Sequence, residues 1–174
     1  MSRYSWLIGD NRSGWATAVA PKDYDELELW DLIESLEDAG DWPSLCLSFS
    51  DGELSDYPPC NVLSRLCSQR LVELLRPIVG DDVRWLPVTI TRNNESLSYF
   101  YMHLPTSPNV IDEEKSTYAG GRILTPHISL KKAEGFSVFG LRKLSPDVII
   151  RANIREAIEQ SDCNGMAFED VPTS

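Results

Sequence analysis

Apolar residues recur along this chain at two spacings, and these spacings separate predicted strands from predicted helices. Short apolar runs at 4–8 and 45–49 are typical of buried strands. The clearest helix is predicted at 23–38, where apolar residues recur at steps of three and neighbouring leucines widen the stripe. The side chains of this stripe are Tyr24, Leu27, Leu29, Trp30, Leu32, Ile33 and Leu36.

The ends of this predicted helix carry recognisable signals. Asp23 and Glu26 have the spacing of a capping box, in which each side chain accepts a hydrogen bond from a free backbone amide of the first turn. Gly40 can take the left-handed conformation that commonly ends a helix. We therefore expect the helix to begin at Asp23 and to end before Gly40.

A second helix and a hairpin are predicted in the middle of the chain. Ser68 can cap a helix whose leucine, valine and isoleucine residues fall on one face. Strands are expected at 83–91 and 97–104, joined through a turn that contains Asn93 and Asn94. Asparagine tolerates a positive φ angle, so a tight hairpin fits this turn.

The rest of the chain predicts short elements in mixed order. Residues 105–121 contain prolines, acidic residues and a glycine pair, and we expect them to be mostly loop. Strands are predicted at 136–141, 148–150 and 166–168, and a helix at 152–160. Because helices and strands do not alternate strictly, the order favours an α+β fold: a mixed, mostly antiparallel sheet with two or three packed helices.

Length and composition predict one folded domain. The chain has 174 residues, of which 42% are hydrophobic and 25% charged, values close to those of average globular proteins. We expect a single domain, with a possible acidic N-terminal lobe at 1–60 and a body at 61–174. The four cysteines have no metal-binding spacing and are expected to be reduced thiols.

The N-terminus predicts a cytoplasmic protein. Residues 1–10 contain one basic residue and no apolar run longer than Trp6–Ile8. Such a run is far too short for a signal peptide or a membrane span. No association with a membrane is therefore expected.

Negative charge is concentrated in the first third of the chain. Residues 1–60 hold 13 acidic residues against Arg3, Arg12 and Lys22, a net charge of −10, whereas the remainder holds 14 acidic and 13 basic residues. Such an acidic surface repels nucleic acid and attracts basic partners over about one Debye length. Nucleic-acid binding is therefore disfavoured, and a basic protein partner is favoured.

Five of these acidic residues are expected on the polar face of the first helix, with no lysine or arginine between them. Like charges three or four residues apart each destabilise a helix by a few tenths of a kcal/mol. Two interpretations stay open: an ordinary solvated helix face, and a surface that binds a basic partner. The residues are Glu28, Asp31, Glu34, Glu37 and Asp38.

Candidate catalytic residues are few. The sequence has no glycine-rich phosphate-binding loop and no metal-ligand spacing, so no cofactor is expected. An enzyme with an unrecognised site stays open as an alternative, because nucleophile and base need not be neighbours in sequence. Such a site would use Cys163, His127, or Asp112 with Lys115. We expect the protein not to be an enzyme.

Several short motifs from Leu63 to Phe168 occur in the order typical of one bacterial family. They are a capped helix at 68–75, strands at 83–90 and 98–102, the segment Ile111–Ser116, the runs 138–141 and 148–150, and Gly165–Phe168. In these motifs the chain resembles the immunity proteins of bacterial polymorphic toxin systems, a family first described as a domain of unknown function.

This resemblance implies a cytoplasmic, non-enzymatic inhibitor that binds and blocks a cognate toxin domain. Together with the charge, it implies that the toxin domain is basic. We expect the acidic helix face to form part of the contact, with Trp42 or Tyr57 as aromatic anchors. An acidic adaptor or regulator of some other basic protein stays open as a second alternative. The oligomeric state is not predicted.

Overall fold

The computed structural model describes residues 3–36, 39–141 and 146–174, which form an α+β fold. The prediction of an α+β fold with mixed, mostly antiparallel strand pairing is confirmed, but the described strands form more than one sheet and the described helices number four rather than two or three. The helices are α1 (Glu26–Ser35), α2 (Gln69–Val79), α3 (Leu130–Ala133) and α4 (Ala152–Glu159). The strands are β1 (Tyr4–Gly9), β2 (Ala18–Val19), β3 (Leu45–Phe49), β4 (Leu66–Ser68), β5 (Arg84–Arg92), β6 (Glu95–His103), β7 (Thr117–Ala119), β8 (Arg122–Thr125), β9 (Val138–Phe139), β10 (Val148–Arg151) and β11 (Met166–Asp170).

The described strands form a four-stranded sheet, a five-stranded sheet and a separate hairpin. The four-stranded sheet has the order β11-β1-β10-β9, and the five-stranded sheet has the order β2-β3-β5-β6-β4. All pairs between these strands are antiparallel except β3 with β5. β7 and β8 pair only with each other. Since β1 lies between β10 and β11, and β3 pairs with β5, residues 1–60 supply strands to both larger sheets.

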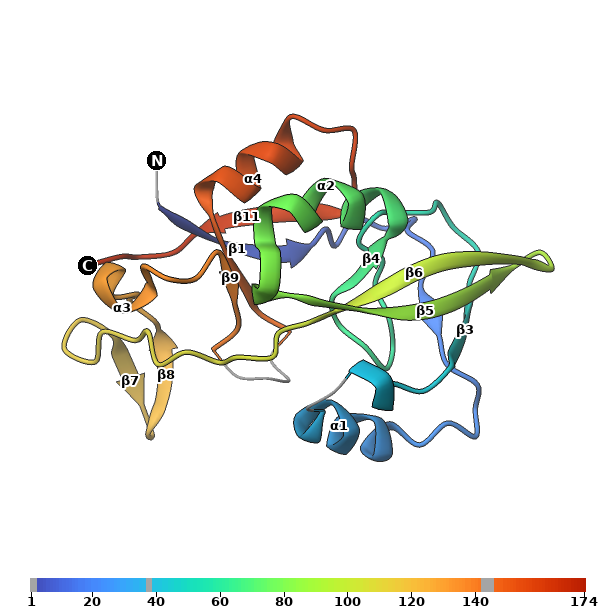
Figure 1. The fold of residues 1–174 in the computed structure, drawn as a ribbon, viewed down its shortest axis with the longest axis horizontal. Coiled ribbons are helices and arrows are strands. Elements are labelled where there is room, and N and C mark those ends of the chain that lie inside the picture. The colour runs from blue at the N-terminus through green and yellow to red at the C-terminus, as the bar shows by residue number, and fades with distance from the viewer. Residues whose placement is uncertain (1–2, 37–38, 142–145) are drawn as a thin grey trace.

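The central core lies where α2 and α4 pack on both larger sheets (Figure 1). Leu71 and Leu75 of α2 and Ile154 of α4 are at most 1% exposed. They meet Leu7 of β1 and Met102 of β6, so this one cluster joins the two sheets. Burying each such side chain stabilises the fold by roughly 1.5–3 kcal/mol.

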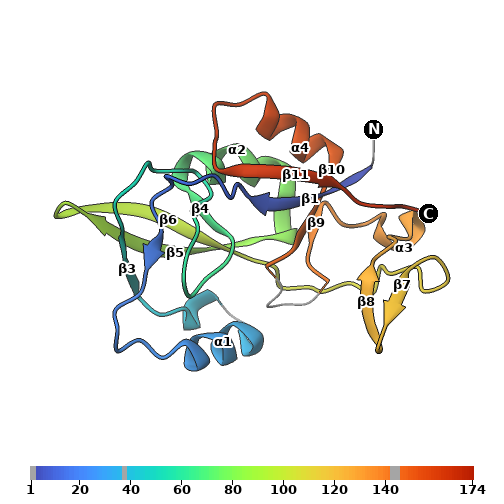
Figure 2. The same ribbon diagram turned by 180° about the vertical axis from the view of Figure 1, so that it is seen from behind.

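Two further cores lie on the outer faces of the sheets. Leu29 and Ile33 of α1 pack on the five-stranded sheet, which places α1 at the opposite end of the molecule from α4 (Figure 2). Under residues 110–136, Tyr4 of β1 packs with Phe139 and Ile149 on the four-stranded sheet.

The first helix differs from its prediction in start and orientation. α1 begins after Asp25, whose carboxylate accepts hydrogen bonds from the amides of Leu27 and Glu28, so the predicted capping box of Asp23 and Glu26 is wrong. The helix ends at Ser35, with an extended residue following it, rather than at Gly40. Leu29, Ile33 and Leu36 form the buried stripe. Glu37 and Asp38 lie outside the described residues.

The predicted second helix and hairpin are confirmed. The hydroxyl of Ser68 accepts a hydrogen bond from the Leu71 amide at 3.2 Å and caps α2. Asn93 and Asn94 have φ angles of 50° and 64° in the turn between β5 and β6, as expected for asparagine at a tight turn.

Some short elements were not predicted. β2, β4 and α3 have two to four residues, too few to give a periodic signal. β7 and β8 lie in and after the segment predicted as loop, and β9 is shorter than the strand expected there. Among the described residues, no helix is long and apolar enough to span a membrane.

Candidate functional site

An acidic surface with apolar side chains at its centre covers the exposed side of α1. Its residues, here called the α1 surface, are Glu26, Leu27, Glu28, Trp30, Asp31 and Glu34. Leu27 is 67% exposed and Trp30 is 41% exposed, although both belong to the stripe predicted to be buried. Because Leu27 and Trp30 are three residues apart, they lie on the same side of the helix, next to the carboxylates.

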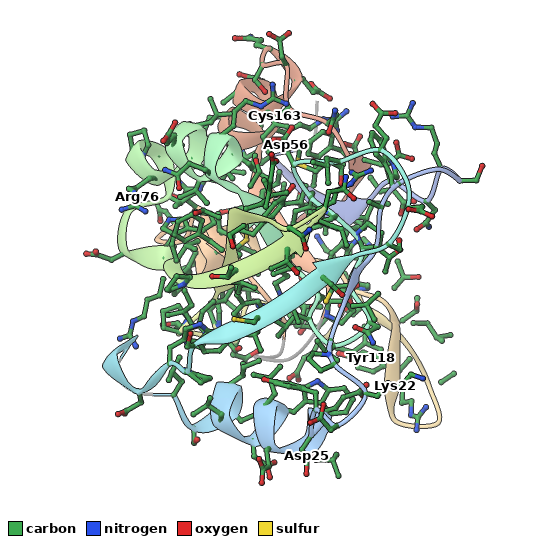
Figure 3. The ribbon with its side chains drawn as sticks, turned by 90° about the vertical axis from the view of Figure 1, so that its right-hand side faces the viewer. Lys22, Asp25, Asp56, Arg76, Tyr118 and Cys163 are labelled. Carbon is green, nitrogen blue, oxygen red and sulfur yellow. The ribbon has the colours of Figure 1, made fainter. Side chains whose placement is uncertain are left out.

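Three carboxylates of this surface, Glu26, Glu28 and Asp31, have no basic partner within the described part of the chain. α1 contains no lysine or arginine, and no ion pair is formed by Glu26, Glu28 or Asp31. Burial, and to a smaller degree the charge of Glu28, raises the pKa of Tyr24 beside the helix. Glu26, Glu28 and Asp31 are all exposed to solvent. Figure 3 shows α1, with Asp25 at its start, at the end of the molecule away from Asp56.

A small pocket adjoins the α1 surface. The indole Nε1 of Trp30 lies 3.4 Å from the carbonyl oxygen of Val62, to which it donates. Between Trp30 and residues 60–64 lies a pocket of about 340 Å³, which Tyr101 also lines. Burial raises the pKa of Cys60, with a smaller contribution from Glu26.

The two predicted aromatic anchors lie in different environments. Trp42 is half-buried; its indole donates to the Pro87 carbonyl at 2.8 Å and stacks on Tyr101 with ring centroids 5.7 Å apart. Tyr57 is 6% exposed and packs in the central core. Trp42 thus presents a rigid partial surface, whereas Tyr57 belongs to the core rather than to any surface.

A buried carboxylate ties three segments together on the other side of the molecule. Asp56 is 5% exposed and accepts hydrogen bonds from the Ser68 hydroxyl at 2.5 Å, from the Asn164 amide at 2.8 Å and from Arg70 at 2.5 Å. Burial acts to raise the pKa of Asp56, but the bonds from Arg70, Ser68 and Asn164 outweigh it and hold the pKa below 3.8. This carboxylate is fully engaged within the fold.

The remaining candidate catalytic residues are not brought together. Asp112 accepts bonds from the amides of Glu114 and Lys115 and from the hydroxyl of Ser174, which fixes a local turn to the C-terminus. Among the described residues, no hydrogen bond joins the side chains of Asp112, His127 and Cys163, and no metal-binding cluster is found. The predicted enzyme alternatives therefore gain no supporting geometry.

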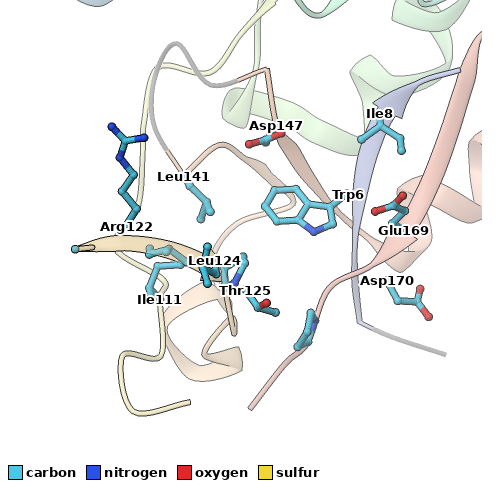
Figure 4. Close-up of a pocket in the computed structure, with 14 residues that line it drawn as sticks. Trp6, Ile8, Ile111, Arg122, Leu124, Thr125, Leu141, Asp147, Glu169 and Asp170 are labelled. Carbon is cyan, nitrogen blue, oxygen red and sulfur yellow. The ribbon is translucent and has the colours of Figure 1, made fainter. Parts of the chain in front are cut away.

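A groove of about 1030 Å³ lies between the β7–β8 hairpin and the four-stranded sheet (Figure 4). Trp6, Leu124 and Leu141 turn toward the same space, and Asp147 and Glu169 flank it. The groove was not predicted from the sequence, because its walls come from parts of the chain that are far apart in sequence. The exposure of Leu27 and Trp30 was not predicted either, although the sequence shows that they are three residues apart and have acidic neighbours.

Comparison with known proteins gives no family for this chain. No protein-family model matches it, and no curated protein matches it.

Proposed function

We propose that this protein is a non-enzymatic inhibitor of a basic protein, and specifically the cytoplasmic immunity partner of a bacterial toxin domain. The observation that carries the proposal is the α1 surface, where Leu27 and Trp30 are exposed beside Glu26, Glu28 and Asp31, which form no ion pair among the described residues. The resemblance to immunity proteins between Leu63 and Phe168 is the ground for the narrower assignment.

The composition of the α1 surface suits recognition of a basic protein. Binding energy in interfaces is concentrated in a few large apolar side chains, and tryptophan is enriched among them. A surrounding rim of charges steers the partner and selects its orientation more than it adds affinity. Leu27 and Trp30 supply the apolar centre, and Glu26, Asp31 and Glu34 supply the rim.

Coexpression with a toxin domain tests the proposed function directly. A candidate toxin domain encoded next to this chain's gene would be the partner to use. Cells that express both are expected to survive, whereas cells that express the toxin domain alone die. Death of the coexpressing cells with both proteins present would refute the immunity assignment. Survival without a complex would refute direct binding, and a stable complex without protection would favour the acidic adaptor.

Charge reversal of three carboxylates tests the role of the α1 surface. We expect the combined variant Glu28→Lys, Asp31→Lys and Glu34→Lys to slow association with the toxin domain by roughly 10- to 100-fold at low salt, because electrostatic steering is lost. Stopped-flow measurement of the association rate at several ionic strengths checks this. The difference from the natural protein should shrink as salt rises.

A second triple variant is the matched control for this experiment. Asp81→Lys, Glu114→Lys and Glu156→Lys change the net charge equally at exposed positions outside α1. This control should associate at a rate much closer to that of the natural protein. Equal slowing by both variants would show that only the net charge matters, and would contradict a specific role for the α1 surface.

The exposed leucine gives a second test that does not depend on charge. Because Leu27 is 67% exposed, Leu27→Ala is expected to change the free energy of unfolding by less than about 0.5 kcal/mol. We expect the same change to weaken toxin binding by about tenfold, as measured by calorimetry. Leu54→Ala, at a leucine 37% exposed outside α1, is the control. Unchanged binding of Leu27→Ala would exclude Leu27 as an anchor.

A further inference from the structure

The β7–β8 hairpin carries exposed apolar side chains. All seven of its strand residues are exposed, and an isolated two-stranded hairpin is at best marginally stable in water. Tyr118 is 45% exposed, Ile123 41% and Leu124 66%. None of the three packs in a hydrophobic core of the described residues. The hairpin thus holds apolar area outside the cores, and Ile123 and Leu124 line the groove.

The opposite wall of the groove is a part of the four-stranded sheet that the third core leaves uncovered. Side chains alternate along a strand, so Tyr4, Trp6 and Ile8 of β1 point to the same face. Tyr4 is buried, and its hydroxyl donates to the Ala133 carbonyl at 2.8 Å. Trp6 and Ile8 continue the row beyond that cover and line the groove. Two apolar walls therefore face each other across an open space.

The charges on the groove are mainly negative. Among the described residues that line it, Asp147, Glu169 and Asp170 are acidic and Arg122 is basic. Figure 4 shows the guanidinium of Arg122 pointing away from Trp6, whereas the carboxylate of Glu169 lies beside it. Asp170 is engaged by Arg155 at 2.9 Å, and Glu169 forms no ion pair within the described residues. Glu169 is thus the carboxylate placed to receive a cation next to an aromatic ring.

We propose that this groove is a second docking site, which binds a polypeptide segment of a partner that presents an apolar side chain together with a lysine or arginine. The apolar side chain lies between Trp6 and Leu124, and the cation lies beside Glu169. The size of the groove, about 1030 Å³, exceeds what one ion needs and suits several residues of a peptide. Glu169, which forms no ion pair among the described residues, favours a basic segment over an acidic one.

Selection from a displayed library of random seven-residue peptides tests this proposal without knowledge of the natural partner. The natural protein is the bait, and the variants Glu169→Lys and Leu124→Glu serve for counter-selection. We expect enriched peptides that combine lysine or arginine with apolar residues, and expect Glu169→Lys to weaken their binding at least about tenfold. Peptide addition should shift the NMR signals of the Trp6 indole and the Glu169 amide.

Further variants make the outcome decisive. Glu169 and Leu124 are exposed, so both variants should fold, and thermal unfolding checks this; Leu124→Ser replaces Leu124→Glu if it does not. The triple α1 variant should bind the selected peptides normally, which separates this site from the proposed function. The proposal is overturned if no peptide is enriched, if enriched peptides lack basic residues, if NMR shifts fall elsewhere, or if the groove pairs two copies of this chain.

Discussion

Replacing Asp56 with asparagine is expected to lower the free energy of unfolding by about 3 kcal/mol at pH 7. The carboxylate is 5% exposed and accepts bonds from Ser68, Arg70 and the Asn164 amide. Asparagine keeps the shape but has a single acceptor oxygen, and its NH₂ group would face a donor. Urea denaturation of both proteins measures the difference.

The effect of this substitution should depend on pH in a defined direction. Hydrogen bonds from Arg70, Ser68 and Asn164 overcome the effect of burial and hold the pKa of Asp56 below its ordinary 3.8 in the folded protein. A group with a lowered pKa stabilises the fold at pH values above its unfolded pKa, and this contribution is lost as pH falls through the folded pKa. The difference between the two proteins should therefore be constant near neutrality and narrow below about pH 4.

Arg70→Gln removes the ion pair but keeps the Asp56 carboxylate, so it measures the contribution of the ion pair alone. The Arg70 side chain is 56% exposed, so its loss should cost about 1 kcal/mol or less, because solvent screens exposed pairs. The larger effect at Asp56 would then come from the Ser68 hydroxyl and the Asn164 amide, which are left without their acceptor. Equal effects of the two substitutions would contradict this assignment.

The Asp56 carboxylate fixes the irregular segment before β4 to α2 and to the turn after α4. The Ser68 hydroxyl donates to Asp56 and accepts from the Leu71 amide, so the cap of α2 and the loop share one hydrogen-bond chain. Asn164 brings in the turn that follows α4. The acidic first third of the sequence is therefore fixed to the near-neutral remainder by a buried anion.

Elements specified by neighbouring residues were predictable from the sequence. The serine cap of α2 and the two asparagines of the β5–β6 turn act through hydrogen bonds and φ angles within a few residues. Their positions follow from local chemistry. The α+β class followed from the order of such elements.

The orientation of α1 was not predictable in the same way. Seven apolar residues surround more than half of the helix, so the pattern allows several buried stripes. Packing on the five-stranded sheet selects Leu29 and Ile33 and leaves Leu27 and Trp30 on the surface. The acidic face was predicted, whereas its apolar centre depends on that tertiary contact.

Contacts between segments that are distant in sequence determine the features of the fold that were not predicted. β1 pairs with β10 and β11, which lie more than 130 residues away, and no local pattern indicates these partners. The groove beside Trp6 and Leu124 exists only because this sheet and the β7–β8 hairpin meet. Candidate binding surfaces of this kind require the fold to be known.

A glycine at the edge of the five-stranded sheet is held in close contact with another segment. Gly52 has a φ angle of 139°, and a Cβ atom added there would lie 2.6 Å from the Ala16 nitrogen and 2.7 Å from the Gly14 oxygen. The same segments are joined by hydrogen bonds from the Ala16 amide to the Glu53 carbonyl and from the Glu53 amide to the Gly14 carbonyl. No side chain can enter without separating these backbones.

Gly52→Ala is therefore expected to destabilise the protein by about 3–4 kcal/mol, the sum of a strained φ angle and a backbone clash. Two matched substitutions separate the contribution of the φ angle from that of the clash. Gly14→Ala has a φ of 113° but open space, so it should cost about 1–2 kcal/mol, whereas Gly135→Ala has open space at an ordinary φ and should be nearly neutral. Thermal and urea unfolding give this order directly. A Gly52→Ala protein as stable as Gly14→Ala would show that the 14–16 segment moves aside freely, and would contradict the close contact.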